Sequence, residues 1–215
     1  MAILPNGING PFIGRIGNTV GYLDKYGTNI IRGIGEKTSS KGKEFDNQQQ
    51  TALVTGLLKP VKEFIKVGFR NAPAEKRWDY YSFATSVNKP GAIKGIYPDQ
   101  EIDYEKVLFS LGNIPPPKNP AVVLNNSILE FSWTSDMDAE GTEADDQIML
   151  IAYFPESMRA LQLLSGARRI EQKQTLRLPV FTKETVIMTY MSFISDDRKK
   201  LSNSVFTGQV IWDKL

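Results

Sequence analysis

The chain has 215 residues, of which 41% are apolar and 23% charged, with a formal net charge of +2. This composition is typical of a folded globular protein and gives no global field for nucleic acid or a membrane surface. It contains no cysteine and no histidine, which excludes disulfides, thiolate nucleophiles and histidine-based catalytic triads and disfavours zinc, copper and haem sites.

The N-terminus lacks the features of a secretory signal, because no basic stretch precedes a long apolar core. No window of the sequence approaches the ~20 apolar residues that a membrane span requires. We therefore expect a cytoplasmic protein without a membrane partner, and nucleic acid is not an expected partner either.

Glycine is concentrated near the N-terminus, with eight of the 17 glycines in residues 7–35. The β-branched and aromatic residues between them predict two strands, Thr19–Leu23 and 28–34, joined as a β-hairpin at residues 24–27. A phosphate-binding loop is the other interpretation. It fails because no G-x-G-x-x-G occurs and Glu36 stands where a P-loop requires glycine.

Two helices are predicted next. Apolar residues recur every three or four positions from Asp46, a suitable N-cap, to Arg70, and Pro60 is expected to kink or divide this helix. Pro73 suits the first turn of a second helix that ends near residues 88–91. Four cations fall on one face of the first helix and are interpreted as a solvated face rather than a nucleic-acid stripe: Lys59, Lys62, Lys66 and Arg70.

Three aromatic residues lie near the start of the second helix: Trp78, Tyr80 and Tyr81. Exposed aromatic rings in such a group would form a platform for a sugar or a peptide. Packing against the first helix is the favoured interpretation, because aromatic residues on the apolar side of a helix usually belong to the core.

Residues 104–111 are predicted to form a strand, and the four prolines in residues 112–120 indicate a linker at 113–119. This linker would separate a region at 1–112, with the hairpin and helices, from a β-domain at 120–215. Short strands with regular turn signals are expected in the latter, near 120–124, 128–134, 147–154, 159–164, 174–178, 185–195 and 203–212.

Two of these segments are expected to organise the β-domain. Residues 128–134 alternate large apolar and polar side chains, whereas residues 147–154 are apolar almost throughout, as in a strand covered on both faces. Seven strands, with Trp133 on the second and Tyr190 on the sixth, resemble a fibronectin type III or immunoglobulin-like sandwich. The predicted fold class is α+β, with an antiparallel C-terminal sandwich.

An acidic loop lies between these two strands. Asp136, Asp138 and Glu140 take the first, third and fifth positions of a calcium loop, so calcium is the one cofactor that the sequence suggests. The pattern then breaks, because the twelfth position is Gln147 rather than a bidentate glutamate. A solvated acidic loop is the favoured interpretation.

No arrangement of residues predicts an active site. The adjacent acids at 145–146 and 196–197 do not by themselves place two carboxylates across a cleft, as acid–base catalysis requires. We expect a non-enzymatic protein whose partner is another protein or a second copy of the chain, joined by strand addition at the glycine-rich hairpin. A carbohydrate- or calcium-binding module is the alternative.

Over nearly its full length the chain resembles an uncharacterised family, a domain of unknown function common in Bacteroidetes genomes. The segments that carry the resemblance are residues 6–10, 14–21, 30–32, 65–69, 92–99, 102–104 and 202–205. The resemblance implies that residues 1–215 are a complete protein without a cleaved leader, and it implies no activity, substrate or catalytic residue.

Overall fold

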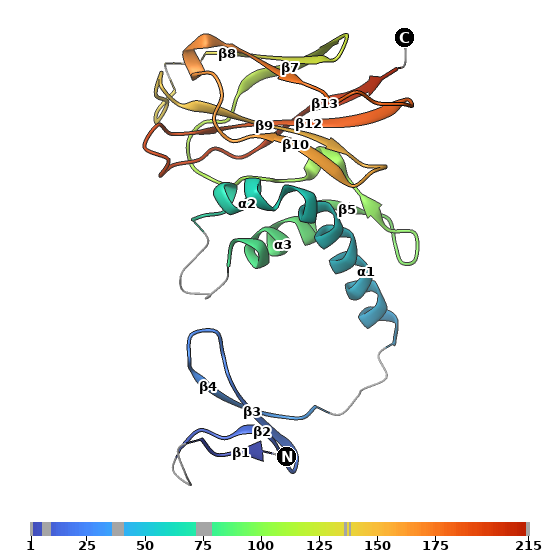
Figure 1. The fold of residues 1–215 in the computed structure, drawn as a ribbon, viewed down its shortest axis with the longest axis vertical. Helices are drawn as coiled ribbons and strands as arrows, with labels where there is room; N and C mark the ends of the chain where they lie inside the picture. The colour runs from blue at the N-terminus through green and yellow to red at the C-terminus, as the bar shows by residue number, and fades with distance from the viewer. Residues whose placement is uncertain are drawn as a thin grey trace. The chain divides into compact units, whose positions relative to one another are not determined.

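A computed structural model describes residues 2–5, 10–35, 41–71, 79–135, 137 and 139–213, without the side chains of residues 41–43. The chain divides into two compact units, Met1–Lys41 and Gly42–Leu215 (Figure 1). The linker predicted at residues 113–119 lies within the second unit.

The first unit is an antiparallel sheet in the order β1-β2-β3-β4, and the predicted hairpin corresponds to its β3 and β4. The loop between these strands is closed by Asp24, whose Oδ1 accepts hydrogen bonds from the backbone N–H groups of Tyr26 (2.9 Å) and Thr28 (2.8 Å). Gly27 adopts a φ of +79°, which favours glycine. The bounds are β1 (Ala2–Ile3), β2 (Ile13–Ile16), β3 (Thr19–Leu23) and β4 (Asn29–Gly33).

The second unit begins with helices. Pro60 divides the first predicted helix as expected. It lies at the start of a short 3-10 segment, where the backbone N–H that proline lacks is not needed for a helical hydrogen bond. Asp46 is not the N-cap: the helix already begins at Lys41, and Asp46 accepts a 2.6 Å bond from Gln100 Nε2. The bounds are α1 (Lys41–Leu58), η1 (Lys59–Val61), α2 (Lys62–Gly68) and α3 (Tyr80–Gly91).

The helix α3 has Asp79 as its N-cap, whose side chain accepts a 2.8 Å hydrogen bond from the N–H of Ser82. It ends at Gly91, within the predicted range. The start predicted at Pro73 lies outside the described residues.

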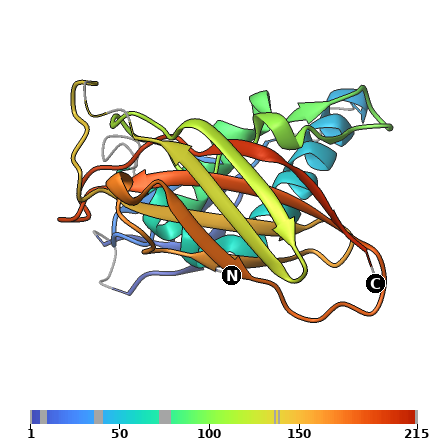
Figure 2. The same ribbon diagram turned by 90° about the horizontal axis from the view of Figure 1, so that it is seen from above.

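Two larger antiparallel sheets, in the orders β11-β8-β7 and β10-β9-β12-β13, follow in the second unit, which also contains a two-stranded sheet of β5 and β6. The seven predicted strands are all present, so the fold is α+β. Figure 2 shows β7 and β8 crossing over the strands of the other sheet. The bounds are β7 (Lys118–Asn125), β8 (Ile128–Thr134), β9 (Gln147–Phe154), β10 (Arg159–Leu163), β11 (Lys173–Arg177), β12 (Thr185–Ile194) and β13 (Val205–Trp212). Shorter elements are β5 (Ile93–Lys94), β6 (Glu101–Ile102), η3 (Tyr104–Lys106) and η4 (Arg169–Glu171).

The strand β9 is covered on both faces, as its uniformly apolar sequence predicts. Met149 and Ile151 belong to a core shared with the helices, whereas the alternate residues Leu150 and Ala152 belong to a core shared with the three-stranded sheet. The sheet of β10, β9, β12 and β13 is therefore the middle layer of the second unit, with helices on one side and β7, β8 and β11 on the other (Figure 1).

The prediction of a strand at residues 104–111 is wrong. Its first three residues form η3, and the rest is an irregular segment. The side chain of Asn88 bonds both the N–H (2.8 Å) and the C=O (2.7 Å) of Leu108, and Ser204 Oγ accepts a 2.8 Å bond from the N–H of Phe109. These side chains satisfy backbone groups that a neighbouring strand would otherwise satisfy.

Within the described part of the chain, no helix is both long enough and apolar enough to cross a bilayer.

Candidate functional site

The sheet of the first unit has large, half-exposed apolar side chains on both of its faces. Cross-strand partners share a face of a sheet, so the register assigns each side chain to one side. One side, here called the arginine face, carries Ile3, Ile13, Arg15, Val20, Tyr22, Ile30 and Arg32. Ile3 is 65% exposed and Tyr22 is 38% exposed, and the guanidinium of Arg32 lies 6.0 Å from the centre of the Tyr22 ring.

The opposite side, here called the glycine face, carries the apolar residues Ile16, Leu23 and Ile31 together with glycines and two polar residues: Gly14, Gly21, Gly33, Thr19 and Asn29. Phe12 packs closely over Gly21, where a Cβ atom would lie 2.3 Å from the carbonyl oxygen of Phe12. The larger side chains of this face are open to solvent: Ile16, Leu23 and Ile31 are 50%, 46% and 55% exposed. Within the described residues of the first unit, both faces thus keep large apolar side chains open to solvent, whereas the sheet of a stable domain buries its apolar face against another element.

The outer strand β4 is an exposed edge. Among the described residues it pairs with β3 alone, and its sequence NIIRG contains no proline and a single charge, Arg32. Natural proteins usually protect edge strands with prolines, bulges or several charges. An edge without these features is able to pair with another strand.

The predicted aromatic platform is only partly described. Trp78 lies outside the described residues, and Tyr80 and Tyr81 are both half-buried at the start of α3. Tyr81 donates a 3.0 Å hydrogen bond to the carbonyl oxygen of Thr55 on α1, and both tyrosines contact the core between helices and sheet. They also line a shallow hollow of about 440 Å³.

The predicted calcium loop is also only partly described. Asp136 and Asp138 lie outside the described residues, and Glu140 is exposed. Ala139 to Thr142 form a turn in which the N–H of Thr142 donates to the carbonyl oxygen of Ala139 at 3.2 Å. No group of three or more acidic side chains able to hold a metal ion occurs in the described part of the chain.

A buried ion pair that no sequence pattern predicts lies at the end of this acidic segment. Arg169 in η4 and Asp146 before β9 are each 1% exposed, and Asp146 Oδ2 accepts bonds from Nε and Nη2 of Arg169, both at 3.1 Å. The same oxygen accepts a 3.2 Å bond from the N–H of Glu143. Burial raises the pKa of the Asp146 carboxyl, even though the Glu143 N–H and Arg169 act in the opposite direction.

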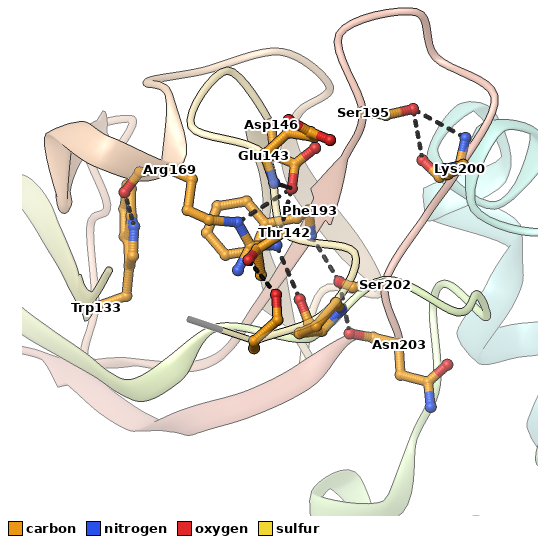
Figure 3. A network of polar contacts seen from close by, with 12 residues as sticks. Trp133, Thr142, Glu143, Asp146, Arg169, Phe193, Ser195, Lys200, Ser202 and Asn203 are labelled. Atoms are coloured by element: carbon orange, nitrogen blue, oxygen red, sulfur yellow. Dashed lines mark hydrogen bonds and ion pairs between the residues drawn. The ribbon is translucent and has the colours of Figure 1, made fainter. Parts of the chain in front are cut away.

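Arg169 also connects other elements of the second unit (Figure 3). Its guanidinium lies 3.8 Å from the centre of the Phe193 ring on β12 and donates a 2.9 Å bond to the carbonyl oxygen of Pro115. Its own carbonyl oxygen accepts a 2.8 Å bond from Nε1 of Trp133 on β8. Arg169 therefore joins both sheets, and this explains why so large a charged side chain is buried.

Beside this ion pair is a polar hollow of about 340 Å³. Its wall contains Asp146 from the turn before β9 and Asp196 and Asp197 from the turn after β12. Hydrogen bonds from the Ser195 hydroxyl (2.6 Å) and the Lys199 N–H (3.0 Å) lower the pKa of Asp197 to about 2. The two pairs of adjacent acids in the sequence, at 145–146 and 196–197, thus line the same hollow.

The sequence model of one protein family, described as "Family of unknown function (DUF6266)", matches residues 11–208. No curated protein matches the chain.

Proposed function

We propose that this chain, which belongs to the DUF6266 family of unknown function, is a non-enzymatic interaction protein whose N-terminal sheet associates with a second copy of the chain. The observation that carries the proposal is the half-exposed apolar surface on both faces of that sheet. Contiguous exposed apolar surface in a soluble protein is typical of an interaction site.

The size of the first unit supports the same proposal. It spans 41 residues, close to the length below which domains usually need disulfides, metals or oligomerisation. The chain has no cysteine, so disulfides are not available. Association with another chain would supply the missing apolar burial.

A second copy is a suitable partner because β4 is able to pair with itself. In an antiparallel β4–β4 pair centred on Ile31, this residue lies opposite Ile31 of the second copy, and Arg32 lies opposite Ile30 of the second copy. No like charges then stand opposite each other, and the two sheets would join into one. Such self-complementary contacts generate closed twofold dimers.

We also propose that the two packed sheets form a fibronectin-like sandwich. Support comes from the strand orders, in which the chain passes repeatedly between the three-stranded and the four-stranded sheet. The apolar core between these sheets contains Trp133 and Trp212. This architecture supports many functions and therefore does not favour an enzyme.

Sedimentation velocity of the full chain over a concentration series tests the dimer. The wild type should sediment as a monomer–dimer equilibrium. Ile31→Lys should weaken the dimer at least about tenfold, because it places like charges opposite each other in the pair. A matched control is Ile211→Lys, since Ile211 is 51% exposed on β13, an edge strand of the second unit.

The control should leave the dissociation constant of the dimer unchanged. A wild-type chain that is monomeric at every concentration would refute the proposal. So would a dimer that Ile211→Lys dissociates and Ile31→Lys does not. Far-ultraviolet circular dichroism of each variant confirms that the second unit remains folded.

A further inference from the structure

An uncharged hollow of about 360 Å³ opens between the helical layer and the end of β9. Its wall comes from α1, β6, η3, the last part of β9 and the turn that follows. None of the described residues that line it is charged, and most are apolar, including Ala52, Leu53 and Leu57 from α1. The volume lies within the range of small-molecule sites.

The hydroxyl of Tyr153 is a polar group in this hollow that the protein leaves without a partner. Tyr153 is 2% exposed and belongs to the core between sheet and helices. Its hydroxyl forms no hydrogen bond with any described residue, yet the oxygen is not sealed from solvent. Because Tyr153 lines the hollow, the hydroxyl opens into it.

Two other tyrosines of the same core show the usual arrangement. The Tyr190 hydroxyl donates a 2.8 Å hydrogen bond to the carbonyl oxygen of Tyr104, and the Tyr81 hydroxyl donates a 3.0 Å bond to that of Thr55. Buried tyrosine hydroxyls normally have such an acceptor. Tyr153 is buried as completely as Tyr190, so its hydroxyl calls for an acceptor from outside the chain.

The phenols in the wall are neutral donors. Tyr104 also lines the hollow, and its ring centre lies 6.1 Å from that of Tyr153. Burial raises the pKa of Tyr153 to about 12 and also raises the pKa of Tyr104. At neutral pH the Tyr153 hydroxyl therefore keeps its proton and donates it to an oxygen acceptor. A charged ligand would lose its hydration here without gaining a counter-charge from the wall.

Met158 gives the hollow an adaptable rim. It is 54% exposed in the turn between β9 and β10, and its Cε atom would lie 3.1 Å from a Cβ added to Gly56 on α1. A methionine side chain adjusts readily to the shape of what it covers. Water in the hollow would bond the Tyr153 hydroxyl but would face a mostly apolar wall, so a ligand with an apolar body displaces it favourably.

We propose that this hollow binds a small uncharged organic molecule, with an apolar body against α1 and a hydrogen-bond acceptor on the Tyr153 hydroxyl. The site lies wholly within Gly42–Leu215. It goes beyond the proposed self-association and stands whether or not β4 forms a dimer.

Amide resonances of the full, ¹⁵N-labelled chain test the site with two probes of nearly the same shape. Acetophenone has a carbonyl acceptor, and ethylbenzene has none. Acetophenone should cause saturable shifts of the amide resonances of Leu53, Gly56, Tyr153 and Met158. Benzoate, which adds a negative charge, should bind at least about tenfold more weakly than acetophenone.

The variant Tyr153→Phe removes only the hydroxyl without a partner. It should weaken acetophenone binding about two- to tenfold, as expected for one hydrogen bond, and should leave ethylbenzene binding unchanged. Tyr81→Phe is the matched control and should affect neither probe, since Tyr81 does not line this hollow. Tyr153→Phe is expected to fold, because no described group loses a partner.

The variant Ala52→Phe tests the place of the apolar body. Ala52 is exposed on α1 and lines the hollow, so a phenylalanine there should occupy the space and weaken binding of both probes at least about tenfold. Gln48→Phe, also exposed and about one turn earlier, lies outside the lining and should leave both affinities unchanged.

Absence of saturable shifts with acetophenone in the wild type would overturn the proposal. So would an equal loss of both probes in Tyr153→Phe, because the hydroxyl would then act only through the structure. Benzoate binding as tight as that of acetophenone would contradict an uncharged ligand. Movement of the same four resonances on dilution, without any probe, would overturn the proposal in favour of a side chain from a second copy.

Discussion

At the scale of single residues, two neighbouring arginines have opposite environments. Arg169 is 1% exposed and bonds Asp146 and Pro115, whereas the side chain of Arg168 is 59% exposed and pairs with Asp145 at the surface. Nothing in the local sequence distinguishes them. The sequence therefore could not predict the buried pair, because burial of Arg169 depends on Phe193 and Trp133, which are distant in the chain.

This difference predicts unequal effects on stability. Arg169→Met should lower the free energy of unfolding by about 3–5 kcal/mol, because it leaves the Asp146 carboxylate buried without its cation. Arg168→Met should change it by less than about 1 kcal/mol, since an exposed pair contributes little. Urea denaturation followed by circular dichroism measures both. Equal effects of the two substitutions would show that Arg169 does not stabilise the second unit through this pair.

At the scale of elements, the strands were predictable and the segment before them was not. The alternation of Leu129, Phe131 and Trp133 and the apolar run of β9 encode strands directly, and both match the structure at residues 128–134 and 147–154. Residues 107–111 have a similar composition, but the side chains of Asn88 and Ser204 satisfy their backbone. Such contacts across 20 or more residues leave no local pattern.

The segment at 107–111 should therefore depend on Asn88. Asn88→Ala leaves the N–H and C=O of Leu108 without their partner and should lower the free energy of unfolding by about 2–3 kcal/mol. Asn203→Ala is a matched control, since Asn203 accepts one exposed 3.0 Å bond from the Gly112 N–H, and it should cost under about 1 kcal/mol. Thermal denaturation of the two variants compares them. A loss for Asn88→Ala no larger than that of the control would contradict this role.

At the scale of the whole molecule, the sequence did not reveal what covers the second face of the four-stranded sheet. An apolar run shows that β9 is buried on both sides but does not identify the covering element, which is the helical layer of α1 to α3. The proline-rich stretch at 113–119 has the composition of a linker, although it lies within one compact unit. The sequence does not show that the elements before and after it pack together. The candidate sites in the first sheet and beside Tyr153 likewise arise from register and packing.

Truncation tests whether the domain boundary lies at the proline-rich segment 113–119 or before residue 42. Residues 42–215 should remain soluble and unfold cooperatively, because both cores are then intact. Residues 120–215 should aggregate, because removal of the helices exposes Met149, Ile151 and Tyr153. Size-exclusion chromatography and thermal denaturation of the two fragments test this. A folded, soluble fragment 120–215 would show that the β-domain is independent of the helices.

The middle layer has a consequence for fluorescence spectroscopy. Two of the three tryptophans, Trp133 and Trp212, belong to the core between the sheets, whereas Tyr153 and Tyr190 belong to the core between sheet and helices. In a Trp78→Phe background, both remaining tryptophans lie in the core between the sheets, so tryptophan emission would report on that core alone. The change in this emission during unfolding would then show when one side of the middle sheet loses its packing, separately from the side that the helices cover.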